Sequence, residues 1–222
     1  MTFTPQSPVR VAIIGGSGKV SRELITLLHA RGDEAVAIFR NAARADELAG
    51  LGAIPRVLDI ESASEAELGD VLAGADVVVF SAGAGGGDPA RTRAVDYDGA
   101  VRAMAAASGA SVARFVMVSA MGAGNAPPTE GDMAVYYRAK HDADAALMAT
   151  SLDWTILRPG ALTDDPATGM VTLGESVSRG SIPRGDVAAV IVAVIDEPKT
   201  IGRAWEFASG AQPIADAVRS LL

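Results

Sequence analysis

The sequence predicts an α/β fold in which helices cover both faces of a doubly wound parallel sheet. Short apolar runs rich in Val and Ile recur along about the first 160 residues, and they are continuous rather than alternating, as in strands buried on both sides. Stretches with helical spacing separate these runs. A glycine-rich turn joins the first run to the first helical stretch. Because crossovers between parallel strands are right-handed, this alternation predicts one sheet between two helix layers.

The strands and helices alternate along the chain in a simple order. Apolar runs predict strands at 9–14, 35–39, 54–58, 77–80, 115–118 and 154–157. Leucine and isoleucine at helical spacing predict a first helix at 21–30, and an acidic stretch predicts another over 61–76, closed by Gly74. Residues 91–107 and 133–150 are rich in alanine and contain no proline, so helices are expected there too.

The pattern changes after residue 160. Strands are expected at 170–175 and 204–210, and helices at 184–198 and 213–222. This tail of about 60 residues is small for an independent domain. We therefore expect one domain over residues 1–222, in which residues from about 160 form a small C-terminal extension on the substrate side. This extension is expected to cover the carboxyl edge of the sheet and to complete the pocket.

Composition excludes several classes of function. The formal net charge of -8 argues against nucleic acid as a partner, and a small-molecule substrate is expected instead. The chain has no cysteine, and its two histidines lack a carboxylate at ligand spacing, so no metal site is expected. The N-terminus has no apolar segment typical of a signal peptide, and the longest apolar run, 187–195, is too short to span a membrane. These features predict a cytoplasmic protein with no membrane partner, and they leave monomer and homodimer open.

The glycine-rich turn matches a dinucleotide-binding fingerprint in a variant form. Gly15 and Gly18 stand at its first and fourth positions, and Ser21 replaces the last glycine. Such a turn brings the backbone and the helix N-terminus close to a pyrophosphate. A phosphate-binding P-loop would need glycine at Ile13, and a nucleophile elbow would need glycine at Lys19, so neither spacing fits. A plain strand-to-helix turn is the alternative interpretation.

The residue after the second strand favours NADP(H) over NAD(H). Sites that select NAD place a carboxylate here, whereas this chain has Arg40, whose guanidinium suits a 2′-phosphate. A solvated arginine is the alternative. Asp59 and Ile60 close the third strand and could flank an adenine, although Asp59 could equally be a helix N-cap or a loop residue. Small residues at 81–83 would let the backbone run beside the cofactor, unless they only form a surface loop.

A possible catalytic group follows the fifth strand. Tyr136 and Lys140 are four residues apart, which places them on one helical face. A nearby lysine would lower the pKa of the tyrosine, and Ser119 could donate a hydrogen bond to a substrate oxygen. Tyr137 is three residues from the same lysine and is the less favoured acid. A Tyr–x–x–x–Lys pattern also arises by chance, so the pair could be structural.

Several segments together resemble a known family. VAIIGGSGKVSREL, AIFRNAARADEL, RFVMVSAMGA, YYRAKHDADAAL and LDWTILRPGALT occur in the order and spacing of the atypical short-chain dehydrogenase/reductases (SDRs). Over nearly its whole length the chain resembles the small NAD(P)H-binding branch, near the NmrA-like and biliverdin reductase B/flavin reductase-like proteins. The resemblance implies a Rossmann fold and a catalytic role for Ser119, Tyr136 and Lys140. It implies these cofactor-binding residues: Gly15, Ser17, Gly18, Lys19, Val20, Arg40, Asp59, Ile60, Ser81, Ala82, Gly83, Tyr136, Lys140, Pro159, Gly160, Ala161 and Leu162.

The resemblance implies an NAD(P)H-dependent oxidoreductase that reduces a small carbonyl, quinone or flavin-like acceptor. Members of this branch vary in the catalytic tyrosine, and some are regulators without established turnover. The alternative is therefore a non-catalytic NADP(H)-binding redox sensor of the NmrA-like type. The chain lacks the larger C-terminal domain of sugar-nucleotide epimerases, which argues against a sugar-nucleotide substrate.

Overall fold

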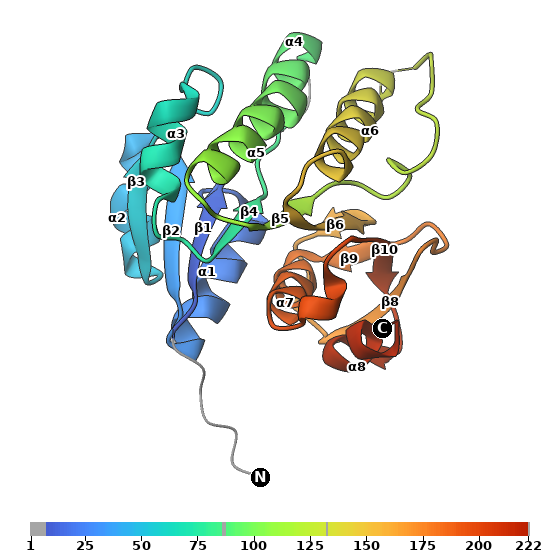
Figure 1. Ribbon diagram of the computed structural model, residues 1–222. Coiled ribbons are helices and arrows are strands. Elements are labelled where there is room, and N and C mark those ends of the chain that lie inside the picture. Colours follow the sequence, from blue (N-terminus) through green and yellow to red (C-terminus); the bar gives the residue numbers. More distant parts are fainter. Residues whose placement is uncertain (1–7, 86–87, 132, 222) are drawn as a thin grey trace.

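A computed structural model of the protein describes residues 8–85, 88–131 and 133–221, and it shows a twisted sheet between two layers of helices (Figure 1). Residues 1–7, which make up most of the segment examined for a signal peptide, lie outside the described residues, as do residues 86–87 in the loop after the fourth predicted strand. No helix in the described ranges is long and apolar enough to cross a membrane.

The main sheet has nine strands, and the chain order of its first six matches a doubly wound topology. Seven neighbouring strands are parallel, from β3 at one edge to β10, while β8 is antiparallel to β10 and to the short β11. In sheet order the strands are β3 (Ala53–Val57), β2 (Glu34–Phe39), β1 (Arg10–Ile14), β4 (Val77–Phe80), β5 (Arg114–Val118), β6 (Asp153–Pro159), β10 (Arg203–Ser209), β8 (Met170–Gly174) and β11 (Gln212–Pro213).

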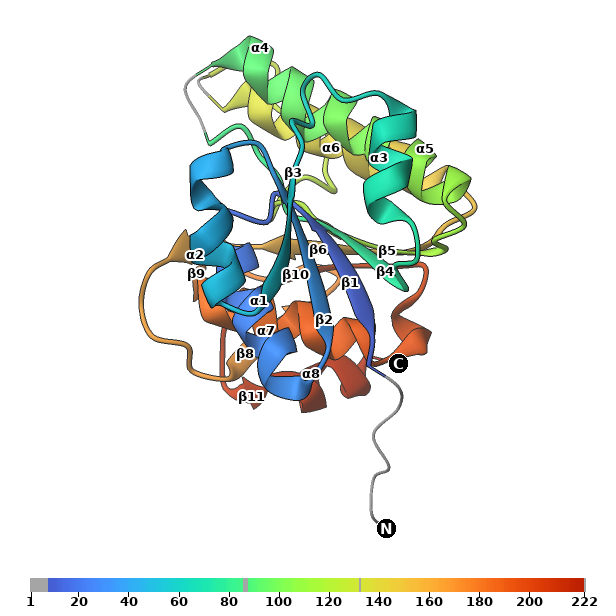
Figure 2. The ribbon, with the colours of Figure 1, turned by 90° about the vertical axis from the view of Figure 1, so that its left-hand side faces the viewer.

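Helices cover both faces of this sheet, as Figure 2 shows. In β1, Val11 and Ile13 belong to one hydrophobic core, and Ala12 and Ile14 belong to the other, because successive strand residues point to opposite faces. The first core lies under α1 (Lys19–Arg31), α2 (Ala45–Gly50), α7 (Arg184–Ile195) and α8 (Ile214–Ser220). The second lies under α3 (Glu65–Leu72), α5 (Ala100–Gly109) and α6 (Ala134–Met148). The predicted fold class is confirmed.

The predicted elements are all present, with differences at their ends. The acidic helix begins only at Glu65, because Ser64 and Glu67 form a capping box there. The helix expected over 91–107 is divided into α4 (Pro89–Thr92), a π-helical segment (Arg93–Gly99) and α5. Helix α2 and the short strands β7 (Ala161–Thr163), β9 (Ser181–Pro183) and β11 were not predicted, since such short elements carry little periodic signal.

The C-terminal tail extends the sheet more than it covers its edge, which corrects one expectation. Strand β10 pairs in parallel with β6, and β8 and β11 continue outward from it. Helix α7 packs beside α1 under the same face. Strands β7 and β9, which pair as a separate two-stranded sheet, lie at the carboxyl edge after β6. The tail is therefore both a continuation of the sheet and a part of the site.

Candidate functional site

The glycine turn lies at the switch point of the sheet. Strand β1 has β2 on one side and β4 on the other, and open α/β sheets bind ligands in the crevice that such a reversal creates. Gly15 has a φ of 86°, and a Cβ added there would lie 2.6 Å from the Cα of Ala82, which follows β4. Only glycine fits this position, so the chain passes β4 closely before it enters α1.

Helix α1 begins with its N-terminus open toward this crevice. Gly18 is the N-cap and has no side chain that could bind the N–H groups of the first turn, and the described first turn holds no acidic residue. The hydroxyl of Ser21 is fully buried and makes no hydrogen bond to the described residues. Free N–H groups and the helix dipole favour an anion here, so the turn fits the pyrophosphate of a dinucleotide.

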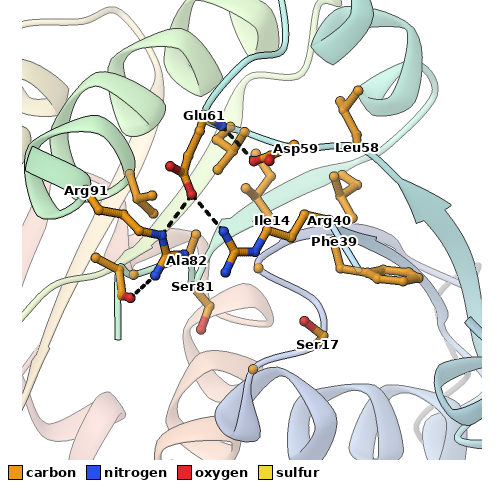
Figure 3. A pocket seen from close by; sticks show the side chains of 17 residues that line it. Ile14, Ser17, Phe39, Arg40, Leu58, Asp59, Glu61, Ser81, Ala82 and Arg91 are labelled. Carbon is orange, nitrogen blue, oxygen red and sulfur yellow. Dashed lines mark hydrogen bonds and ion pairs between the residues drawn. The ribbon is translucent and has the colours of Figure 1, made fainter. Parts of the chain in front are cut away.

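A cavity of about 320 Å³ adjoins the turn, and we call it the glycine-turn cavity (Figure 3). It brings together most of the expected cofactor-binding residues from the ends of β1 to β4. Val20 is instead buried in the core, and Lys19 lies 2.5 Å from Asp164 in a neighbouring cavity. The cavity is lined by Ile14, Gly15, Ser17, Gly18, Ile38, Phe39, Arg40, Leu58, Asp59, Ile60, Glu61, Ser81, Ala82, Gly83, Ala84, Arg91 and Val95.

Two arginines converge on one carboxylate in this cavity. Arg40 Nη1 and Arg91 Nε each lie 3.0 Å from Glu61 Oε1, and Figure 3 shows both side chains pointing toward that oxygen. Arg91 also donates to the carbonyl of Ala84. Sequence reasoning identified Arg40 but missed Glu61 and Arg91. The sequence signalled them only by their positions, since Glu61 follows Ile60 directly and Arg91 comes shortly after the glycine-rich stretch that follows β4, within α4.

The segment that carries Glu61 has a fixed backbone. Asp59 Oδ1 accepts a hydrogen bond of 3.0 Å from the N–H of Glu61, and Arg102 from α5 donates to the carbonyl of Ile60 at 2.6 Å. Asp59 is therefore a loop residue, whereas the N-cap of α3 is Ser64. Asp59 and Ile60 both line the glycine-turn cavity, and hydrogen bonds within the protein hold the backbone of their segment.

A second cavity, of about 450 Å³, lies at the carboxyl ends of β5 and β6, and we call it the Tyr136 cavity. Its wall is mainly apolar, and Tyr136 packs edge-on against Tyr137 with ring centroids 5.5 Å apart. Thus Ser119, Tyr136 and the expected nicotinamide-side segment meet in one place. The cavity is lined by Val118, Ser119, Ala120, Met121, Met133, Tyr136, Tyr137, Pro159, Gly160, Ala161, Leu162, Arg179 and Gly180.

Lys140 lies beneath this cavity, paired with a buried carboxylate. Its Nζ is 3.0 Å from Asp96 Oδ1, 3.4 Å from the carbonyl of Val118 and 5.9 Å from the centre of the Tyr136 ring. Asp96 comes from the π-helical segment, and its Oδ2 accepts a 2.9 Å hydrogen bond from Ala84 N, in the wall of the glycine-turn cavity. Sequence reasoning missed Asp96, because its burial comes from tertiary packing, in which the π-helical segment contacts α4, α5 and α6.

The pKa of Tyr136 is shifted in the direction opposite to the one expected. Burial raises this pKa above its ordinary value, the charge of Lys140 opposes the rise only in part, and Asp96 adds to it. Burial alone would lower the pKa of Lys140, but attraction to Asp96 and Tyr136 leaves it raised. The lysine therefore stays charged, and the tyrosine keeps its proton at pH 7.

Ser119 is joined to a second buried ion pair. Its hydroxyl lies near Asp144, but it makes no hydrogen bond of ordinary geometry with the described residues. Arg158 Nε is 2.8 Å from Asp144 Oδ2, and burial raises the pKa of Asp144 while Arg158 opposes the rise. Asp144 is four residues beyond Lys140, so helical spacing could have identified it.

Glu206 connects two loops that border the Tyr136 cavity. This buried residue of β10 accepts hydrogen bonds from the backbone N–H of Gly122 at 2.8 Å and of Val177 at 3.2 Å. One loop follows Ser119, and the other leads to Arg179 and Gly180. The tail thus helps to shape the cavity through one carboxylate, which sequence reasoning also missed.

Comparison with known proteins places these features in a family. The profile of the NAD(P)H-binding family matches residues 15–198. The chain is 37% identical to the uncharacterized sugar epimerase YhfK of Bacillus subtilis (strain 168), over 96% of this chain and all of that protein. It is likewise 37% identical to the UPF0659 protein YMR090W of Saccharomyces cerevisiae, over 97% of this chain and all of the yeast protein.

Solved structures agree with this assignment. A Bacillus halodurans protein named for the NAD-dependent epimerases and dehydratases superposes with a TM-score of 0.89 at 37% identity, covering 96% of this chain and all of that one. The oxidoreductase ylbE of Lactococcus lactis superposes with a TM-score of 0.84 at 31% identity, covering 95% of each chain. Both likenesses extend over nearly the whole chain.

Proposed function

The chain belongs to the NAD(P)H-binding family, and from that premise we propose that it is an NADP(H)-dependent oxidoreductase of the atypical SDR type, reducing a small carbonyl, quinone or flavin-like acceptor. One observation carries the proposal: Asp96 joins the two cavities. One of its oxygens binds Ala84 at the glycine-turn cavity, and the other pairs with Lys140 beneath the Tyr136 cavity. A cofactor held in the first cavity would therefore have the candidate acid close to its reactive end.

The residues of the first cavity fit a dinucleotide. The open N-terminus of α1 and the glycine turn would hold the pyrophosphate, and Arg40 would hold the 2′-phosphate. Asp59 and Ile60 would flank the adenine, and the segment 81–83 would run beside the middle of the cofactor. The nicotinamide end would lie near 159–162. When bound, the reduced nicotinamide would supply a hydride to the acceptor, which for a carbonyl compound is received by the carbonyl carbon.

The Tyr136 side chain would supply the proton that the acceptor oxygen needs. Burial keeps the phenol neutral at pH 7, so the proton is present at the hydroxyl when it is required. Lys140 lies beneath the Tyr136 cavity and stays charged, so it would stabilise the phenolate that forms when Tyr136 gives up its proton. Ser119, a buried residue in the wall of the same cavity, would turn its hydroxyl toward the acceptor oxygen and hold it. The net charge of -8 and the apolar wall favour a small apolar acceptor over a nucleic acid.

A second candidate function is a non-catalytic NADP(H)-binding sensor. The pairing of Lys140 with Asp96 favours it, because the lysine charge is already largely compensated and the pKa of Tyr136 is raised. Such a pair exchanges a proton less readily than a tyrosine beside an uncompensated lysine. Both candidates require nucleotide binding, and only turnover separates them.

The experiment that tests the proposal follows NADPH absorbance against a panel of quinones, flavins, aldehydes and ketones. We expect consumption by the wild type and a fall of about 10²–10⁴-fold in Tyr136→Phe, the usual contribution of a general acid. Tyr97→Phe is the control, since Tyr97 lies in the π-helical segment beside Arg93 and lines neither cavity. Full turnover in Tyr136→Phe would overturn the assignment of the acid, and intact binding without turnover would support the sensor.

A further inference from the structure

We propose that Glu61 occupies the 2′-phosphate position in the free protein, and that Arg91 is a second phosphate-binding residue beside Arg40. Binding of NADP(H) would exchange the Glu61 carboxylate for the phosphate, so Glu61 limits how strongly the site prefers NADP(H) over NAD(H). This inference rests on the proposed function, because it requires the glycine-turn cavity to bind a dinucleotide.

The geometry at Glu61 is that of an anion-binding site. Arg40 follows β2 and Arg91 belongs to α4, yet both guanidinium groups lie 3.0 Å from the same oxygen, Glu61 Oε1. All three residues line the glycine-turn cavity (Figure 3). Guanidinium groups bind phosphate as they bind carboxylate, and a phosphate offers more oxygens to two such groups than one carboxylate does.

The Glu61 side chain can leave while its backbone stays in place. Asp59 and Arg102 hold the backbone of this segment through the hydrogen bonds described above. The side chains remain in contact with solvent, with exposed fractions of 27% for Glu61 and 54% for Arg40. Ion pairs at such exposure are weak, so rotation of the carboxylate into water is a small cost.

Charge makes this exchange selective between the two cofactors. A 2′-phosphate beside Glu61 would place like charges together, and the carboxylate must therefore withdraw before Arg40 and Arg91 can bind the phosphate. NAD(H) carries a neutral 2′-hydroxyl, which could donate a hydrogen bond to the carboxylate where it stands. Removing the charge at position 61 should thus help NADP(H) alone.

The test is calorimetric titration of NADP⁺ and NAD⁺ into the wild type, Glu61→Gln and Arg91→Gln. We expect Glu61→Gln to bind NADP⁺ roughly three- to tenfold more tightly, with NAD⁺ binding unchanged or weaker. We expect Arg91→Gln to bind NADP⁺ roughly five- to tenfold more weakly, with less than about a twofold change for NAD⁺. Thermal melts of each variant without nucleotide would verify that it is folded.

Glu47→Gln is the matched control. Glu47 also joins two arginines, Arg22 and Arg44, but it lies outside the lining of the glycine-turn cavity. The Glu47→Gln variant therefore loses the same charge as Glu61→Gln without a change in the proposed site, and its affinity for NADP⁺ should differ from that of the wild type by less than about twofold.

The outcomes separate the inference from the proposed function. If the wild type binds neither nucleotide, the proposed function fails and the inference falls with it. If NADP⁺ binds and Glu61→Gln weakens or does not change that binding, Glu61 only positions the arginines, and the inference alone is overturned. An unchanged NADP⁺ affinity in Arg91→Gln would likewise overturn the role given to Arg91.

Discussion

Lys140 Nζ lies 3.0 Å from Asp96 Oδ1 inside the protein, and the exposed fractions of the two side chains are only 7% and 1%. This pair joins α6 to the π-helical segment, and through Asp96 Oδ2 it reaches the backbone of Ala84. A buried charge without its partner is costly, so each residue depends on the other. The pairing also explains why Lys140 lowers the pKa of Tyr136 less than the spacing of the two residues suggests.

Removing either member of the pair should destabilise the protein strongly. We expect Lys140→Met and Asp96→Asn each to lower the free energy of unfolding by about 3–5 kcal/mol, since each leaves a buried polar partner unpaired. The double variant should recover part of this loss. Urea denaturation measures all three, with Asp98→Asn as the control, because its pair with Arg93 is exposed and should be worth less than about 1 kcal/mol. Additive losses would contradict the coupling.

Tyr136 should ionise only above pH 10. Burial raises its folded-state pKa above the ordinary value of 10.0, so the fold favours the neutral phenol. The resulting stability is fully present below pH 10 and is lost as the pH rises through the folded-state pKa. The tyrosinate absorbance of the wild type and of Tyr136→Phe is followed as the pH is raised, and the difference between the two curves gives the ionisation of Tyr136. A difference step below pH 10 would contradict the burial argument.

Gly15 should tolerate no side chain. Gly15 has a φ of 86°, and a Cβ there would lie 2.6 Å from Ala82 Cα. Gly15→Ala should therefore abolish nucleotide binding, and it should destabilise the fold by more than the cost of placing alanine at a positive φ, because the clash with Ala82 is added to that cost. Gly32→Ala is the matched control, since its φ is 82° and the added Cβ would meet no described atom within 4 Å beyond its neighbours along the chain. It should cost only about 1–2 kcal/mol and bind nucleotide normally. Thermal melts with and without NADP⁺ measure both effects, and equal behaviour of the variants would contradict this account.

Glu206→Gln should loosen the loops around the Tyr136 cavity. An amide offers one acceptor oxygen in place of two, so the hydrogen bond from Gly122 or that from Val177 is lost, at about 1–3 kcal/mol. Hydrogen exchange should quicken in the peptides that carry these two amides. Glu197→Gln is the control, because the Glu197 carboxylate accepts a hydrogen bond from the backbone N–H of Lys199 at a surface turn. This variant should leave the exchange rate of those peptides unchanged. Unchanged exchange in Glu206→Gln would show that the carboxylate does not hold the loops.

Periodicity and turn chemistry, which are local properties, predicted most of the fold. Continuous apolar runs located the first six strands of the sheet in chain order, and the spacing of glycines located the turn before α1. The same spacing placed Tyr136 and Lys140 on one helical face. Elements of a few residues, such as β7 and β9, were missed because two or three residues show no period.

Tertiary packing decided how the charged side chains are paired. The sequence identified Arg40, Tyr136 and Lys140 as single residues, since each stands in a recognisable local pattern. It could not show that Glu61 binds Arg40 or that Asp96 binds Lys140, because these partners lie 21 and 44 positions away and meet only when the sheet and helices assemble. Burial, which sets the direction of the pKa of Tyr136, is likewise a property of the assembled fold.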